Sequence, residues 1–152
     1  MMLRCFLHPD EQEQLKLQAS QILLFNIGDS VSRLAALEYL ASYLENRNLN
    51  YAEKGSIASV MESLLSNTHL GERVREKARY LLFIADPARI KSEVEQLSIV
   101  AYLHGLKEDK GFASVNAEKR ALESLAVFSG MLPTNEELKK AIRYLELSCH
   151  AV

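Results

Sequence analysis

The strongest constraint on the fold is a pattern of three residues that recurs after 42 positions. An arginine is followed three positions later by an alanine, and the alanine is followed four positions later by a leucine. The two copies are Arg33, Ala36, Leu40 and Arg75, Ala78, Leu82. Residues with this spacing share one face of a helix, and a small residue one turn before a leucine lets a second helix approach closely. A period in the forties with two helices in each period is typical of a helical solenoid.

A third copy of the pattern is partial. Ala121 and Leu125 follow 43 residues after Ala78 and Leu82, but Glu118 stands where the arginine would fall. The sequence therefore predicts about three helix pairs.

Prolines and glycines divide the chain into segments of helical periodicity. We expect helices over about 9–26, 30–44, 51–66, 72–85, 87–105, 117–129 and 134–149. No segment shows the alternation of a strand. The prediction is one all-α domain over 1–152, with about seven helices in antiparallel pairs over about 9–44, 51–85 and 87–129 and a final helix over 134–149.

Capping residues predict where several of these helices begin. Asp86 and Pro87 form the clearest signal. A carboxylate at the cap accepts a hydrogen bond from an unpaired backbone N–H of the first turn, and proline has no N–H at the first helical position, where an N–H would have no partner. The other expected caps are Asp29 or Ser30, Asn50 with Glu53, Asn116, and Thr134 with Glu137. The helix that starts at Pro87 is expected to bury Ile90, Val94, Leu97 and Ala101. The polar residues 107–111 are expected to form a solvated loop.

The segment 74–82 resembles the second helix of HEAT and armadillo repeats. The family's valine, arginine, alanine and leucine positions are filled by Val74, Arg75, Ala78 and Leu82. Residues 29–40 resemble the same helix more loosely, with Asp29 at the family's aspartate position. The third unit lacks the arginine, and the first helices of the pairs share no common pattern. The resemblance implies a short right-handed stack of helix pairs, and an irregular helical bundle is the alternative.

Composition narrows the class of protein. The chain has 152 residues, of which 48% are hydrophobic and 25% charged, as in an ordinary globular domain. Its net charge of -2 lacks the basic excess of an obligate nucleic-acid binder. The apolar start is broken by Arg4 and stopped by Pro9, and no later run reaches the roughly 18 apolar residues of a spanning helix. We expect a cytoplasmic protein with no membrane contact.

Four residues form a candidate zinc set: Cys5, His8, Cys149 and His150. Thiolates and imidazoles suit zinc. Adjacent residues on a helix point about 100° apart, however, and the set requires the two ends of the chain to meet. We therefore expect no metal site, and the two cysteines do not suggest a disulfide framework.

No motif identifies an enzyme. The chain has no glycine-flanked serine turn and no glycine-rich phosphate loop, since its six glycines are scattered singly. His69 is expected in a loop and His104 in the last turn of a helix, where solvation or capping explains both. We therefore expect a noncatalytic protein without a cofactor.

Two helices carry concentrated charge. The fourth expected helix holds Glu72, Arg73, Arg75, Glu76, Lys77 and Arg79. This face is either bridged by internal ion pairs or a surface for an anionic partner. The last helix carries a second basic face at Lys139, Lys140 and Arg143, and neither face has the interleaved aromatics of a single-strand binder.

The predicted function is a noncatalytic protein–protein interaction module that binds a partner through a helical surface. An adaptor, an inhibitor such as an immunity protein, or a secretion chaperone would fit. The alternatives are a nucleic-acid-binding helical repeat and an enzyme of unrecognised type whose polar groups converge from several helices. The predicted partner-binding residues are Tyr39, Tyr43, Arg75, Arg79 and Tyr80, because tyrosine and arginine are common interface anchors. The tyrosines would alternatively be core residues with their hydroxyls at the rim.

Overall fold

A computed structural model describes residues 9–25, 29–131 and 135–150. The helices are α1 (Pro9–Leu24), α2 (Ser30–Asn46), α3 (Tyr51–Leu65), α4 (Glu72–Ala85), α5 (Glu93–Gly105), α6 (Val115–Gly130) and α7 (Glu136–His150). Two short turns join them, a 3-10 turn η2 (Pro87–Arg89) and a π turn η3 (Leu106–Lys110). These described residues contain no strand. The all-α prediction is confirmed.

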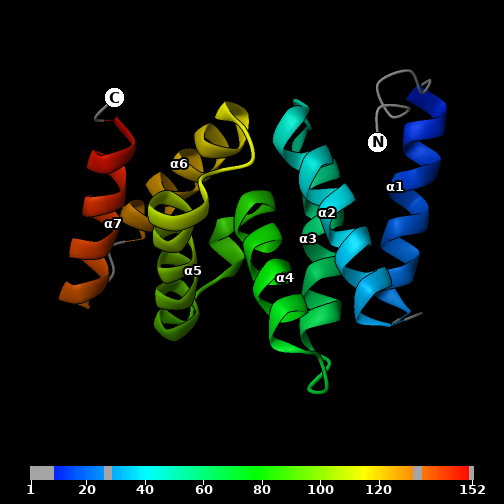
Figure 1. Cartoon of the computed structure of the whole chain (residues 1–152), viewed down its shortest axis with the longest axis horizontal. Coiled ribbons are helices and arrows are strands. Elements are labelled where there is room, and N and C mark those ends of the chain that lie inside the picture. Colours follow the sequence, from blue (N-terminus) through cyan, green and yellow to red (C-terminus); the bar gives the residue numbers. More distant parts are fainter. Residues whose placement is uncertain (1–8, 26–28, 132–134, 151–152) are drawn as a thin grey trace.

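The first four helices form two layers. α1 packs on α2 and α3 packs on α4, while α1 also contacts α3 and α2 also contacts α4. In Figure 1 this block lies toward the α1 end of the molecule, and α7 lies at the opposite end. Stacked pairs of this kind are the arrangement expected for the first two helix pairs.

The third expected pair is arranged differently. α5 packs on α4, whereas α6 contacts α2, α4 and η2, and both helices pack on α7. The principal contacts of α5 and α6 are therefore with other helices rather than with each other. A regular HEAT-like stack stays a prediction.

The recurring alanine and leucine positions are buried in all three copies. They are Ala36, Leu40, Ala78, Leu82, Ala121 and Leu125. The three helices that carry them, α2, α4 and α6, contact one another. The ring centroids of Phe83 and Phe128 lie 5.0 Å apart and join α4 to α6. The spacing noticed in the sequence therefore marks the centre of the core.

The predicted helix start at Pro87 is wrong. Asp86 and Pro87 open only the turn η2, and α5 begins at Glu93 after Ser92. One local and one long-range contact of Arg89 hold this turn. The Arg89 guanidinium donates to Asp86 Oδ2 at 2.9 Å and to Glu62 Oε1 at 2.6 Å, which ties the turn to α3.

The buried face of α5 also differs from the prediction. Ile90 is buried, but it precedes the helix, and its carbonyl accepts a hydrogen bond from the buried Gln96 side chain at 2.9 Å. Val94 is 73% exposed, and Ala101 is exposed as well. The buried residues of α5 are Gln96, Ile99, Val100 and Leu103.

The predicted caps at Asp29 and at Asn50 with Glu53 are confirmed, whereas the predicted cap at Asn116 is wrong. Asp29 accepts from the Ser32 N–H, and Asn50 and Glu53 form the predicted capping box. α6 is capped by Ser114 rather than Asn116, because the Ser114 hydroxyl accepts from the Ala117 N–H.

The start of α7 and the segment 107–111 differ in detail from the prediction. The Asn135 side chain accepts from the Leu138 N–H at the start of α7. Thr134 lies outside the described residues, so its predicted role with Glu137 is untested. The expected solvated loop after α5 forms the turn η3, and the Gly111 N–H donates to the Leu106 carbonyl.

Replacing Arg89 by alanine should lower the free energy of unfolding by about 1–2 kcal/mol, because it removes charge-assisted hydrogen bonds that are only partly screened by solvent. Arg89→Lys should recover part of this loss, since one ammonium cannot reach all the same acceptors. Urea unfolding measures both. Lys91→Ala, at an exposed neighbouring position, is the control. If Arg89→Ala lowers the free energy of unfolding no more than the control does, the contacts of Arg89 with Asp86 and Glu62 do not stabilise the fold.

Candidate functional site

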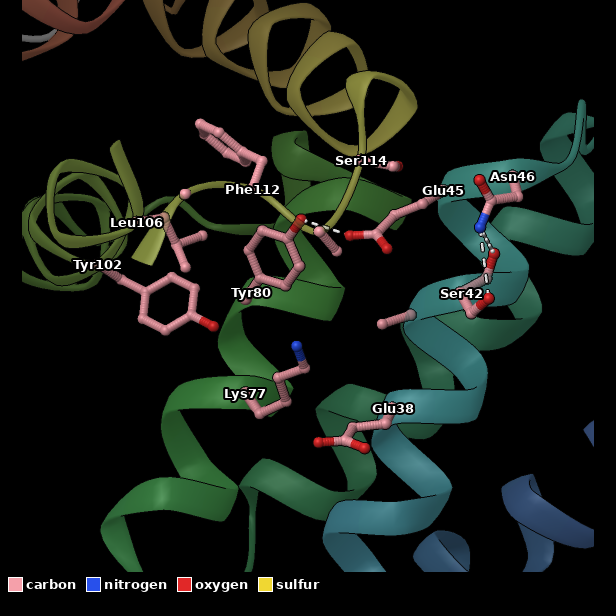
Figure 2. Close-up of a pocket in the computed structure, with 13 residues that line it drawn as sticks. Glu38, Ser42, Glu45, Asn46, Lys77, Tyr80, Tyr102, Leu106, Phe112 and Ser114 are labelled. Atoms are coloured by element: carbon pink, nitrogen blue, oxygen red, sulfur yellow. Dashed lines mark hydrogen bonds between the residues drawn. The ribbon is translucent and has the colours of Figure 1, made fainter. Parts of the chain in front are cut away.

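A cavity of about 520 Å³ lies between α2, α4, α5, η3 and the loop that leads to α6. Figure 2 shows Glu38, Ser42 and Asn46 on the α2 side, with Tyr102 and Leu106 across from them. Tyr80 of α4 stands between the two sides. The cavity thus has one polar wall and one largely apolar wall.

The spacing of residues along α2 creates the polar wall. Glu38, Ser42 and Glu45 are separated by four and three positions, which places them on one face of the helix. Ala41 also lines this wall, and its small side chain leaves room between the two carboxylates. The Asn46 side chain donates to the Ser42 carbonyl at 3.0 Å, so it is held against its own helix.

The central contact of the cavity joins Tyr80 to Glu45. Both residues are buried, with 3% and 6% of their surface exposed, and the Tyr80 hydroxyl donates to Glu45 Oε2 at 2.7 Å. Burial raises the pKa of Tyr80, and the charge of Glu45 and the hydrogen bond raise it further. Tyr80 therefore stays a phenol and a donor at neutral pH.

Aromatic rings and one ammonium complete the site. The Tyr80 and Tyr102 ring centroids lie 5.4 Å apart. Lys77 Nζ lies 5.2 Å from the Tyr80 ring centroid, in the range of a cation–π contact. Burial raises the pKa of the Tyr102 hydroxyl, with smaller contributions from the charges of Glu76 and Glu45.

Gly111 allows the chain to close the cavity. Its φ of 75° lies in the left-handed region, which a side chain would strain. This turn carries the chain from η3 to Phe112, which lines the cavity and packs against the core.

A second concave surface lies between α5 and α7. This groove has a volume of about 540 Å³, and apolar residues from both helices dominate its lining: Leu97, Val100, Ala101, Ala141 and Leu145. His104, Lys140 and Tyr144 also line it. The His104 and Tyr144 ring centroids are 5.4 Å apart, and the Tyr144 hydroxyl donates to Glu108 Oε1 at 3.0 Å. We call this surface the α5–α7 groove.

The predicted contact tyrosines are not freely exposed. Tyr43 is 5% exposed, and its hydroxyl donates to Glu13 Oε1 at 2.6 Å, which links α2 to α1. The Arg47 guanidinium lies 4.7 Å from the Tyr43 ring centroid. Tyr80 is buried at the cavity, and Tyr39 is half-buried beside Tyr43. The expectation of exposure is therefore wrong for Tyr43 and Tyr80, which fit the alternative of core tyrosines.

The two predicted contact arginines take part in internal contacts. Arg75 donates to the backbone carbonyls of Leu65 at 3.3 Å and of Asn67 at 2.6 Å, where α3 ends. Arg79 pairs with Glu72 at 3.6 Å. The five predicted residues do not form one exposed surface, and partner binding by them stays a prediction.

Sequence reasoning missed the two concave surfaces for different reasons. Glu45 and Tyr102 carry no local motif, and their neighbours in space are far away in the chain. The spacing of Val94, Leu97 and Ala101 predicts a face of the helix that is buried in the core, not one that lines a groove. In the structure Leu97 and Ala101 line the α5–α7 groove, and Val94 is exposed on the same helix.

The candidate zinc set, at which we expect no metal, is outside the side chains that the structure describes. Within the described ranges, no group of three histidine, cysteine, aspartate or glutamate residues is placed to hold a metal ion. No helix in the same part of the chain is long and apolar enough to cross a membrane.

Comparison with known protein families, with curated proteins and with solved structures finds no match to this chain. The resemblance to HEAT and armadillo repeats therefore stays a prediction.

Replacing Tyr80 by phenylalanine should lower the free energy of unfolding by about 1–3 kcal/mol, because it leaves the buried Glu45 carboxylate without its hydrogen bond. Tyr102→Phe is the matched control, since it removes a hydroxyl for which the described residues provide no hydrogen-bond acceptor. Urea unfolding of both variants measures the difference. Equal effects of the two substitutions would show that the hydrogen bond to Glu45 contributes nothing specific.

Replacing Tyr43 by phenylalanine should reduce the alkaline sensitivity of the fold. Burial, with the hydrogen bond and charge of Glu13, raises the pKa of Tyr43 to about 12, whereas an unfolded tyrosine titrates near pH 10. Between these values the unfolded chain loses a proton that the folded chain keeps, so stability falls as the pH rises. The loss of unfolding free energy between about pH 9 and about pH 11.5 should be smaller in Tyr43→Phe than in the unaltered chain.

Tyr51→Phe is the control for this pH experiment, because Tyr51 is 83% exposed. Its pH profile should match that of the unaltered chain. If Tyr43→Phe loses as much stability at alkaline pH as the unaltered chain, Tyr43 does not retain its proton in the folded state.

Proposed function

We propose that the chain is a noncatalytic protein-binding module that holds an acidic amphipathic helix of its partner in the α5–α7 groove. An adaptor, an immunity-type inhibitor and a secretion chaperone would all use such a surface. The observation that carries the proposal is the apolar groove left open between two neighbouring helices.

The apolar character of the groove favours a partner protein. Leu97 and Ala101 lie one helical turn apart on α5, and Leu145 faces them from α7. Val94 and Leu147, on the same two helices, are 73% and 65% exposed. An apolar groove with a polar rim marks an interaction site more often than ordinary surface does.

The shape of the groove favours a helix as the bound element. A groove between two packed helices accepts the apolar face of a third helix, whose residues at every third or fourth position fill it. α7 packs on α5 and α6 at one end of the fold, so the groove lies beside the last helix (Figure 1).

The charge beside the groove favours an acidic partner. Lys140 lines the groove, and Arg143 is exposed one turn later on α7. Lys139 pairs with Glu136 at 3.2 Å, but no ion pair within the described ranges engages Lys140 or Arg143. Unpaired cations at the edge of an apolar groove attract and orient an acidic segment.

The two alternatives have weaker support. Nucleic-acid binding relied partly on Arg75 and Arg79, which contact groups within the chain. An enzyme needs polar groups that converge from several helices, and the cavity beside Glu45 meets that condition. Its carboxylate–phenol hydrogen bond and its ammonium on a ring join side chains of α2 and α4 to one another, and neither contact by itself identifies a reaction.

The test is capture of the partner from the native source by the unaltered chain and by two variants. Ala101→Glu places a carboxylate in the apolar groove at an exposed position and should weaken partner binding about tenfold or more. Tyr51→Ala, on the exposed surface of α3, is the control and should bind normally. Full capture by Ala101→Glu would contradict the proposal.

The charge of the partner is tested by reversing the two cations. Lys140→Glu combined with Arg143→Glu should weaken binding at low salt, and the difference from the unaltered chain should shrink as salt screens the charges. An unchanged affinity would show that the partner segment is not acidic. A dimer of this chain that Ala101→Glu disrupts would instead assign the groove to a second copy.

A further inference from the structure

The cavity beside Glu45 has a charge that the chain itself does not fully balance. Glu38, Glu45 and Lys77 line it, so its wall carries two carboxylates and one ammonium. The described part of the chain contains no ion pair between Lys77 and either carboxylate. The cavity therefore has one net negative charge, carried by groups that face a common space.

Glu45 is the buried carboxylate of the cavity, whereas Glu38 is exposed. Glu45 is 94% buried, and the Tyr80 hydroxyl satisfies one of its carboxylate oxygens. A buried carboxylate is costly unless further donors or a positive charge reach it. In Figure 2 the Glu45 carboxylate points toward Tyr80 from the α2 side, at the edge of the cavity.

The chain's own ammonium marks the kind of group that this wall attracts. Lys77 Nζ lies 5.2 Å from the Tyr80 ring centroid, and Figure 2 shows it on the Glu38 side of that ring. An aromatic face attracts cations through its negative potential. The hydroxyl of the same tyrosine donates to Glu45, so an ammonium at Glu45 would lie at the hydroxyl end of Tyr80.

The remaining wall suits an apolar group. Tyr102, Leu106 and Phe112 line the cavity across from the α2 carboxylates and pack against the core. A volume of about 520 Å³ lies in the range of small-molecule sites. A ligand that fits both walls has a cationic end and an apolar body.

We propose that this cavity binds a primary ammonium group at the end of an apolar chain, with its N–H groups donating to Glu45 and its apolar part against Tyr102 and Phe112. A free amine and a lysine side chain of a peptide share this chemistry. The site has no lining residue in common with the α5–α7 groove, so it is a separate site from the proposed partner surface.

Isothermal titration with three matched probes tests the ligand class. Phenethylammonium should bind with a Kd of about 1 mM or tighter, whereas the neutral 2-phenylethanol and the anionic 3-phenylpropionate should bind at least about tenfold more weakly. Equal binding of the alcohol or tighter binding of the anion would overturn the proposal. Titration with Nα-acetyl-lysine N-methylamide identifies the source, because the tighter of the two ammonium probes reveals whether a free amine or a lysine is preferred.

Two substitutions test the position of the ligand. Glu45→Gln keeps an oxygen that accepts from Tyr80 but loses the charge, and it should weaken phenethylammonium binding about tenfold or more. Glu95→Gln, at an exposed position of α5 outside the cavity, is the matched control and should bind normally. Unchanged binding by Glu45→Gln would overturn the proposal.

A second variant protects the test against a folding defect in Glu45→Gln. Lys77→Met removes the internal ammonium and keeps an apolar stem, so phenethylammonium should bind about fivefold more tightly because one like charge is gone. Circular dichroism checks that each variant is folded. Binding by Lys77→Met that is no tighter than that of the unaltered chain would overturn the assignment of the ammonium to this cavity.

Discussion

The structure depends on the burial of the second half of α4 on every side. Its residues from Tyr80 to Ala85 are all buried, and helices α2, α3, α5 and α6 pack around it. A fully enclosed helix segment must be apolar or have its polar groups satisfied. Tyr80 is the polar side chain in this stretch, and Glu45 of α2 satisfies it. One hydrogen bond at the centre therefore places a carboxylate at the edge of a cavity.

A central α4 also explains why a groove remains at one end of the fold. α2, α3, α5 and α6 all pack on α4, while α1 and α7 are outermost (Figure 1). α7 covers part of α5 and α6, but no further helix in the described part of the chain covers the other side of the α5–α7 pair. Leu97 and Ala101 consequently line an open groove, although their spacing is that of a core-facing stripe.

Several predictions that succeeded depend on neighbours in sequence, whereas the failures at Pro87, Tyr80 and the exposed face of α5 depend on distant contacts. Asp29 and Asn50 cap helices through residues three positions away, so the sequence was sufficient for them. Pro87 has an equally strong local signal, but Arg89 ties that turn to Glu62, 27 residues earlier. Tyr80 was recognised as a notable residue, yet its partner Glu45 lies 35 positions away. Helical spacing identified the face of Val94, Leu97 and Ala101, but spacing alone does not show whether a neighbouring helix covers that face.

α5 connects the two concave surfaces. It contributes Tyr102 to the cavity and Ala101 to the groove, and adjacent helical residues point about 100° apart. Ile99 and Leu103 hold the helix in the core between these two directions. A ligand on either surface would influence the other through α5 or through η3, whose Leu106 lines the cavity and whose Glu108 accepts a hydrogen bond from Tyr144 of the groove. Such coupling must be equal in both directions, because the free energy that links two binding events does not depend on their order. The affinity for an amine, measured with and without a bound partner, would therefore report on the coupling that α5 and η3 carry between the two surfaces.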